Sequence, residues 1–157
     1  MVAKLSRRGF SLIELVIVVV IIGIIAAIAV PRMSRGAAGA GDSALAGNLA
    51  TLRNAIDLYQ TEHAGTYPTD ETTILGQLTT YTDDSGAAQA AADATHIYGP
   101  YIRVLPPLPV GARKNQSGIA AADAATVGWI YDKTAHTIKA NCTAGEKDAR
   151  GVAYNTY

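Results

Sequence analysis

The chain has 157 residues, which is enough for one domain of ordinary size and an appendage. Thirteen basic and thirteen acidic residues leave no net charge, so the composition offers no basic footprint for binding nucleic acid. The single cysteine, Cys142, excludes a disulfide within the chain, and an inert, partly buried thiol is favoured over a disulfide between two chains.

The first feature along the chain is a long apolar segment. From residue 10 to residue 30 every residue is apolar, glycine or serine, apart from Glu14. A helix of this length, at about 1.5 Å per residue, spans roughly the 30 Å hydrocarbon core of a membrane. Lys4, Arg7 and Arg8 precede it. Positive residues stay on the cytoplasmic side, which predicts a single-pass protein with its N-terminus inside and its C-terminal part outside.

Three interpretations compete for this segment: a secretory signal peptide cut after Ala29, an uncleaved anchor, or a short leader removed just before the apolar residues. Glu14 favours the third. A carboxylate in a membrane segment costs on the order of 2.5–3.5 kcal/mol on insertion scales, so it is rarely present without a function. Neither a signal peptide nor a plain anchor requires a carboxylate at this position.

Residues 7–15, Arg-Arg-Gly-Phe-Ser-Leu-Ile-Glu-Leu, resemble the processing motif of type IV pilins and of type II secretion pseudopilins. The resemblance implies that a dedicated membrane peptidase cuts between Gly9 and Phe10 and then methylates the amine of Phe10. Glu14 becomes the fifth residue of the mature chain. Pro31 becomes the twenty-second, where the family commonly has a proline.

The chemistry of Phe10 and Glu14 supports this interpretation. Cleavage creates an α-amine on Phe10, whose pKa is normally near 7.7–8 and which is therefore largely cationic. In lipid, this cation and the Glu14 carboxylate are each costly alone and favourable as a pair. One alternative is a pair between neighbouring subunits, which would fix their register. The other is a pair within one helix, because Phe10 and Glu14 are at positions i and i+4. Both alternatives remain open at this stage.

Two weak points are expected in the long helix. Gly23 lowers helix propensity by about 1 kcal/mol relative to alanine, and Pro31 lacks an amide proton and crowds the preceding turn. We expect a helix break between them, either as a kink or as a loss of helical order in the filament. Residues 32–41 contain three glycines in six residues, which predicts a flexible segment.

After Asp42 and Ser43, which are candidate N-caps, apolar residues return with the spacing of one helix face. These residues are Leu45, Leu49, Leu52, Ile56 and Tyr59. The stripe is expected to form the core of a small head domain, with contact between subunits as the alternative. Gly65 and Pro68 end the helix.

The remaining sequence predicts an α+β head. Residues 72–80 are expected to form a short helix, and residues 87–94 one helical turn or a mobile loop. The prolines of residues 105–109 predict an extended surface segment. Residues 127–131 alternate in polarity and residues 136–140 can pair with them as an antiparallel hairpin. The expected fold is thus a long N-terminal helix, half transmembrane and half amphipathic, packed on a small C-terminal domain with a β-hairpin, the lollipop arrangement of pilins.

The predicted divisions are a leader at residues 1–9, a transmembrane and filament-core helix at 10–30, an amphipathic helix with a glycine-rich segment at 31–63, and a globular head at 64–157. The resemblance implies a structural subunit of a type II secretion pseudopilus, with a type IV pilin of a surface fibre as the alternative. Its implied partners are copies of itself, the prepilin peptidase and methyltransferase, an inner-membrane assembly platform with its ATPase, other pseudopilins, and membrane lipid.

No enzyme is expected. The three histidines are scattered, and the sequence has no metalloprotease, P-loop or hydrolase signature. No cofactor is expected either. Related pseudopilins often hold calcium in an acidic C-terminal loop, but here the tail offers only Glu146 and Asp148, fewer than a site with six to eight oxygens needs.

Overall fold

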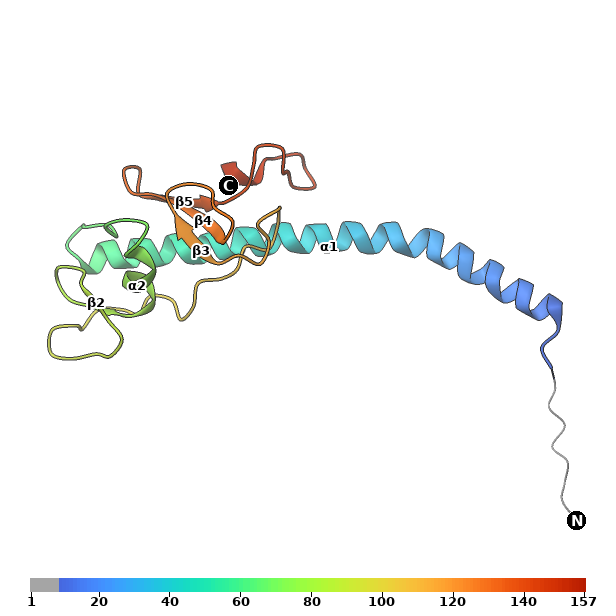
Figure 1. The fold of residues 1–157 in the computed structure, drawn as a ribbon, viewed down its shortest axis with the longest axis horizontal. Coiled ribbons are helices and arrows are strands. Elements are labelled where there is room, and N and C mark those ends of the chain that lie inside the picture. Colours follow the sequence, from blue (N-terminus) through green and yellow to red (C-terminus); the bar gives the residue numbers. More distant parts are fainter. Residues whose placement is uncertain (1–8) are drawn as a thin grey trace, which may run out of the picture. The chain divides into compact units, whose positions relative to one another are not determined.

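The structure is a computed structural model that describes residues 9–157. It consists of two compact units, Met1–Ala37 and Ala38–Tyr157. The first helix, α1 (Leu12–Glu62), begins in the first unit and ends in the second (Figure 1). The fold class predicted from the sequence is confirmed: a long N-terminal helix packs through its second half on a small α+β domain.

The flexible segment expected at residues 32–41 is wrong for the isolated chain, because α1 is helical throughout this range. The glycines alternate with alanines, which have the highest helix propensity of all residues. Each glycine costs only about 1 kcal/mol, and helix extension is cooperative once turns exist on both sides. The composition weakens this part of the helix without ending it.

The second half of α1 supplies one wall of the core of the head. The predicted apolar stripe is fully buried: Leu45, Leu49, Leu52, Ile56 and Tyr59 are each at most 2% exposed. The opposite face of the same helix is open, as Leu58 at 53% exposure shows. The helical period therefore separates a packed face from a free face.

Three strands cover the buried face of α1 (Figure 1). They are β3 (Gly118–Ala120), β4 (Val127–Asp132) and β5 (Thr137–Ala140), in the order β3-β4-β5. The predicted hairpin is confirmed, since β4 and β5 are antiparallel with Trp129 opposite Ala140. The parallel pairing of β3 with β4 was not predicted. Trp129 and Tyr131 on β4 are 0% and 1% exposed and face the helix with Ile138 of β5.

A smaller layer closes the other end of the core. Helix α2 (Ile74–Thr79) lies within the predicted range and buries Ile74 and Leu78. Strands β1 (Tyr81–Thr82) and β2 (Ala88–Gln89) form a short antiparallel pair. Of the two alternatives for residues 87–94, the helical turn is therefore wrong, and the mobile loop stays a prediction. Alanine favours a helix, but the Asp83 carboxylate accepts hydrogen bonds from the amides of Ser85 and Ala87 and holds this part of the chain in a turn.

The proline-containing segment 105–109 is part of the core rather than a surface element. Leu105 and Leu108 are 6% and 0% exposed. The indole Nε1 of Trp129 donates to the carbonyl of Pro106 at 2.8 Å, and Asn48 Nδ2 on α1 donates to the carbonyl of Pro107 at 3.1 Å. These two side chains satisfy backbone carbonyl oxygens that lie outside any β-ladder. The prediction of a surface segment gave too little weight to Leu105 and Leu108.

The C-terminal segment is fastened to α1 by polar contacts. Asp42, predicted as an N-cap, lies inside α1 instead and accepts hydrogen bonds from the hydroxyl of Tyr154 at 2.6 Å and from the amide of Ala149 at 3.1 Å. Arg53 donates to the carbonyl oxygen of Tyr157 at 2.6 Å. The chain ends in a short 3-10 helix, η1 (Tyr154–Thr156). These contacts hold the last residues of the chain against the helix.

Candidate processing and assembly site

The predicted cleavage site lies immediately before α1. Residues 9–11 have no regular secondary structure, and α1 begins at Leu12. Among residues 9–157, no atom lies within 4 Å of the position that a Cβ on Gly9 would take, and Phe10 is 80% exposed. No packing by these residues would keep a protease away from the peptide bond between Gly9 and Phe10. Arg7 and Arg8, predicted to belong to the same site, lie outside the described residues.

Glu14 occupies the third position of α1 and folds back over the helix end. Its Oε2 accepts a hydrogen bond from the backbone amide of Ser11 at 2.8 Å. The first amides of a helix have no partner within the helix, and a glutamate at the third position can satisfy one of them. This contact was not predicted, although the pattern Ser-x-x-Glu at residues 11–14 is the sequence signature of a capping box. It also sets a negative charge at the positive end of the helix dipole.

The contact bears on the two alternatives left open for Glu14. Ser11 follows Phe10 directly, so a carboxylate that holds the Ser11 amide lies next to the nitrogen that becomes the free amine after cleavage. The conformation of the isolated chain thus turns Glu14 toward its own N-terminus. Pairing with a neighbouring subunit remains a prediction, since the structure contains one chain.

The large apolar side chains of the first unit are not packed against any other described part of the chain. All large apolar side chains from Phe10 to Val30 are at least 46% exposed, the value for Val18. The part Leu12–Val30 is long and apolar enough to cross a membrane once. Burying one such side chain is worth about 1.5–3 kcal/mol, so this surface requires lipid or other protein around it. The head has no comparable exposed surface among the described residues.

In the isolated chain α1 runs through both Gly23 and Pro31, so neither residue ends the helix, and the predicted kink stays a prediction. Gly23 meets no neighbour within 4 Å, so its effect is limited to propensity. A proline inside a helix removes one hydrogen bond and bends the axis without always ending the helix. Loss of helical order at this point in a filament stays a prediction.

Residues 4–30 match the family model of the prokaryotic N-terminal methylation motif. This range covers about a sixth of the chain and includes the predicted cleavage site, Glu14 and the apolar helix that follows. The N-terminal part of the chain therefore carries a type IV pilin-like, prepilin-type motif. No curated protein and no solved structure is significantly similar to it.

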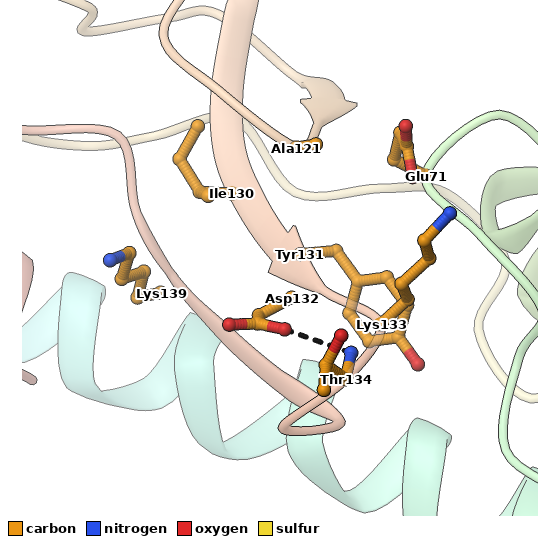
Figure 2. Close-up of a pocket in the computed structure, with 8 residues that line it drawn as sticks. All are labelled: Glu71, Ala121, Ile130, Tyr131, Asp132, Lys133, Thr134 and Lys139. Atoms are coloured by element: carbon orange, nitrogen blue, oxygen red, sulfur yellow. Dashed lines mark hydrogen bonds between the residues drawn. The ribbon is translucent and has the colours of Figure 1, made fainter.

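The head has an open pocket of about 390 Å³ beside the β4–β5 hairpin (Figure 2). Lys133, Thr134 and Lys139 line it together with Glu71, whose Oε2 is buried and has no hydrogen-bond partner. Asp132 accepts a hydrogen bond from the amide of Thr134 at 2.8 Å and so fixes the hairpin turn. The lining contains no serine, cysteine or histidine.

The C-terminal carboxylates of the head are already bonded by protein groups. Asp148 Oδ1 accepts from the amides of Arg150 and Val152, and its Oδ2 accepts from Arg150 Nε and the Tyr157 hydroxyl. These contacts, with that of Tyr157 the strongest, hold the pKa of Asp148 well below its usual range. Glu146 accepts from the amides of Ala112 and Thr143. Few lone pairs remain for the oxygen-rich coordination that calcium needs.

Metal ligands do not gather elsewhere in the described part of the chain: residues 9–157 hold no group of three or more histidine, cysteine, aspartate or glutamate side chains suited to a metal ion. His63 is buried between α1 and β1, with Nδ1 2.9 Å from the Tyr59 carbonyl oxygen and Nε2 3.0 Å from that of Asp83. Its ring stacks on Tyr59 at 3.9 Å. This histidine ties the end of α1 to the strand that follows.

Cys142 follows β5 and is half-buried. Burial, and to a smaller extent the nearby Glu146 carboxylate, raises the pKa of the Cys142 thiol to about 11. The thiolate is the reactive form of cysteine, so this thiol is protected against oxidation and disulfide exchange at neutral pH.

Proposed function

We propose that the chain is the structural subunit of a type II secretion pseudopilus, assembled from the inner membrane after cleavage between Gly9 and Phe10. The observation that carries this proposal is the prepilin-type motif at residues 4–30, joined to a helix whose apolar residues are uncovered. A structural subunit of this kind needs no catalytic group. Such a subunit packs its apolar helix against the helices of other copies, and the resulting filament drives protein export.

Lipid and neighbouring helices are two successive environments for the same surface. In the membrane, acyl chains cover the side chains from Phe10 to Val30. In a filament, the same side chains pack against other subunits, and the head stays outside. The basic residues Lys4, Arg7 and Arg8 favour a cytoplasmic N-terminus, which supports the proposal of a periplasmic head. The prepilin peptidase and methyltransferase, an assembly platform with its ATPase, and other pseudopilins are the partners proposed.

Assembly requires the charge of Glu14 in this proposal. A carboxylate and a cationic amine in lipid stabilise one another, and a pair made between subunits fixes axial register. Removing the acid leaves the neighbour's Phe10 amine as an uncompensated charge, which is costly in an apolar medium.

The test is assembly in cells that express the chain with a prepilin peptidase and a secretion assembly platform. We expect filaments from the wild-type chain, and processed, membrane-inserted subunits without filaments from Glu14→Ala. Leu58→Ala is the control for an exposed change on the same helix, outside the apolar residues 10–30. Normal filaments from Glu14→Ala, or none from the wild-type chain, would refute the proposal.

A type IV pilin of a long surface fibre is the alternative. Many such pilins close a C-terminal loop with a disulfide, which the single Cys142 excludes here, and the Tyr67-Pro68 and hairpin sequences resemble pseudopilins more closely. Restoration of protein export in a pseudopilin-deficient strain supports the pseudopilus, whereas long retractable surface fibres support the pilus.

A further inference from the structure

We infer that His63 is a pH-sensitive latch of the head: its doubly protonated ring ties the end of α1 to the segment after β1 by donating to a carbonyl oxygen on each side. The proposed function gives this buried side chain no task. The compartment whose pH the latch meets rests on the proposed function, in which the head is periplasmic. The latch itself is a property of one folded head and does not depend on assembly.

Each ring nitrogen of His63 lies within hydrogen-bonding distance of a backbone carbonyl oxygen. Nδ1 is 2.9 Å from the carbonyl oxygen of Tyr59, and Nε2 is 3.0 Å from that of Asp83. A carbonyl oxygen can only accept, and a neutral imidazole has a single N–H to donate. A neutral ring therefore leaves one unprotonated nitrogen facing an acceptor, whereas a ring with protons on both nitrogens donates to both carbonyls.

The hydroxyl of Thr82 shows what changes when the ring loses a proton. Its Oγ1 is 3.1 Å from Nε2 of His63, and a hydroxyl can donate or accept. With a neutral ring the hydroxyl can donate to Nε2, but the Asp83 carbonyl then keeps only the amide of Gly86 as a donor. His63 and Thr82 are 4% and 0% exposed, so the lost hydrogen bond is not readily replaced by one to water.

Tyrosine rings surround the imidazole and favour its cation, because the face of an aromatic ring attracts positive charge. Tyr59 stacks on it with the ring centroids 3.9 Å apart, Tyr98 lies at 4.9 Å and Tyr101 at 6.5 Å. Burial raises the pKa of Tyr59 and of Tyr101, and a hydrogen bond to Asp84 raises the pKa of Tyr98. The three phenols therefore stay neutral at ordinary pH and do not compete for the charge.

The charges near His63 also favour a cation. His63 follows Glu62, the last residue of α1, where the helix dipole presents its negative end. The carboxylates of Glu62 and Asp83 add negative charge. His96, a basic side chain close enough to act on the Asp83 carboxylate, is itself paired with the carboxylate of Asp93 at 2.9 Å. Burial alone favours the neutral ring, but the carbonyls, the aromatic faces and these charges all favour the doubly protonated one.

A proton that the fold prefers makes the stability of the head depend on pH. The stability from the latch is present at low pH and is lost as the pH rises through the range in which histidine titrates, about 5–8. His63→Gln keeps a side chain that donates and accepts hydrogen bonds but carries no charge. His136→Gln is the matched control, because His136 is exposed and stacks on Tyr67, away from the latch.

The experiment is NMR of the histidine ring nitrogens of the full chain in detergent micelles, with thermal unfolding of the same samples. We expect both ring nitrogens of His63 to carry protons at about pH 6. Between about pH 5 and 8 the melting temperature of the wild type and of His136→Gln should fall by about 4–8 °C more than that of His63→Gln, the shift that corresponds to a partly buried cation at a helix C-terminus. The same fall in His63→Gln and wild type would overturn the inference.

The ring spectrum of the wild-type chain decides if His63→Gln does not fold: two protonated nitrogens on His63 at about pH 6 support the latch, and a single one overturns it. Neither measurement involves filaments. A failed latch therefore leaves the proposed function intact, and normal filaments from Glu14→Ala would remove the proposed function without affecting the latch.

Discussion

Replacing Leu52 with alanine tests whether the stripe on α1 is the core of the head or a contact between subunits. Leu52 is 0% exposed and belongs to the same cluster as Trp129 and Leu108. Removing a buried leucine side chain costs its transfer free energy and leaves a cavity, for a total of about 2–5 kcal/mol. Leu58→Ala is the matched control on the same helix, because Leu58 is 53% exposed and a surface change of this kind costs within about 0.5 kcal/mol.

The melting temperature of the head reports the difference. For a domain of this size, 1 kcal/mol corresponds to a shift of about 4 °C, so we expect Leu52→Ala to lower the melting temperature by about 8–20 °C and Leu58→Ala by no more than about 2 °C. Trp129 is the only tryptophan and is fully buried, so its fluorescence follows unfolding of the head in the full chain held in detergent micelles.

Equal melting temperatures for the two variants would refute the reasoning. They would mean that the stripe contributes little to the stability of one subunit, and the alternative that it contacts other subunits would take its place. Loss of filaments from Leu58→Ala with an unchanged melting temperature would instead assign a contact between subunits to the open face of the helix.

Two further predictions concern titratable groups of the head. Because the pKa of Cys142 is raised to about 11, its reaction with iodoacetamide at pH 7.5 should be at least about a hundredfold slower than that of an ordinary thiol with a pKa near 8.5, and unfolding in urea should restore the ordinary rate; equal rates in the folded and unfolded chain would contradict the burial. The lowered pKa of Asp148 stabilises the head above the unfolded-state pKa of about 3.9, and this stability is lost as the pH falls further and Asp148 is protonated in the folded state. Asp148→Asn should therefore lower the melting temperature at pH 7 and reduce its fall below pH 4; the same pH profile in wild type and variant would show that Asp148 is not responsible.

Features encoded in local periodicity could be predicted from the sequence. The spacing of Leu45, Leu49 and Leu52 repeats with the helical turn, so the pattern alone identifies the buried face of α1. The β4–β5 hairpin follows from the alternation around Trp129 and from the close spacing of its two strands. The apolar segment with its isolated acid at Glu14 is equally local, which is why the motif at residues 7–15 could be identified from the sequence.

Features that depend on distant partners could not be predicted in the same way. Aspartate is a favoured N-cap residue, and this preference is the basis of the prediction for Asp42. Asp42 instead lies inside a continuous helix, where the hydroxyl of Tyr154, 112 residues further along the chain, donates a hydrogen bond to it. The parallel partner of β4 is a three-residue strand with no pattern of its own. Leu105 and Leu108 are buried because Trp129 and Asn48 satisfy carbonyls in the proline segment, which is a tertiary effect.

The cap at Ser11 is a different case, because its signal was present in the sequence. Ser-x-x-Glu is a recognised pattern at a helix start, but the cost of a carboxylate in the membrane directed attention to the amine of Phe10 as the partner of Glu14.

The central claim is that this chain is a prepilin cut between Gly9 and Phe10, and mass spectrometry of the mature protein purified from membranes tests it most directly. We predict a polypeptide that begins at Phe10 and carries one methyl group on its N-terminal amine. A polypeptide that retains residues 1–9, or one that begins at Val30 after signal-peptide cleavage, would contradict the account.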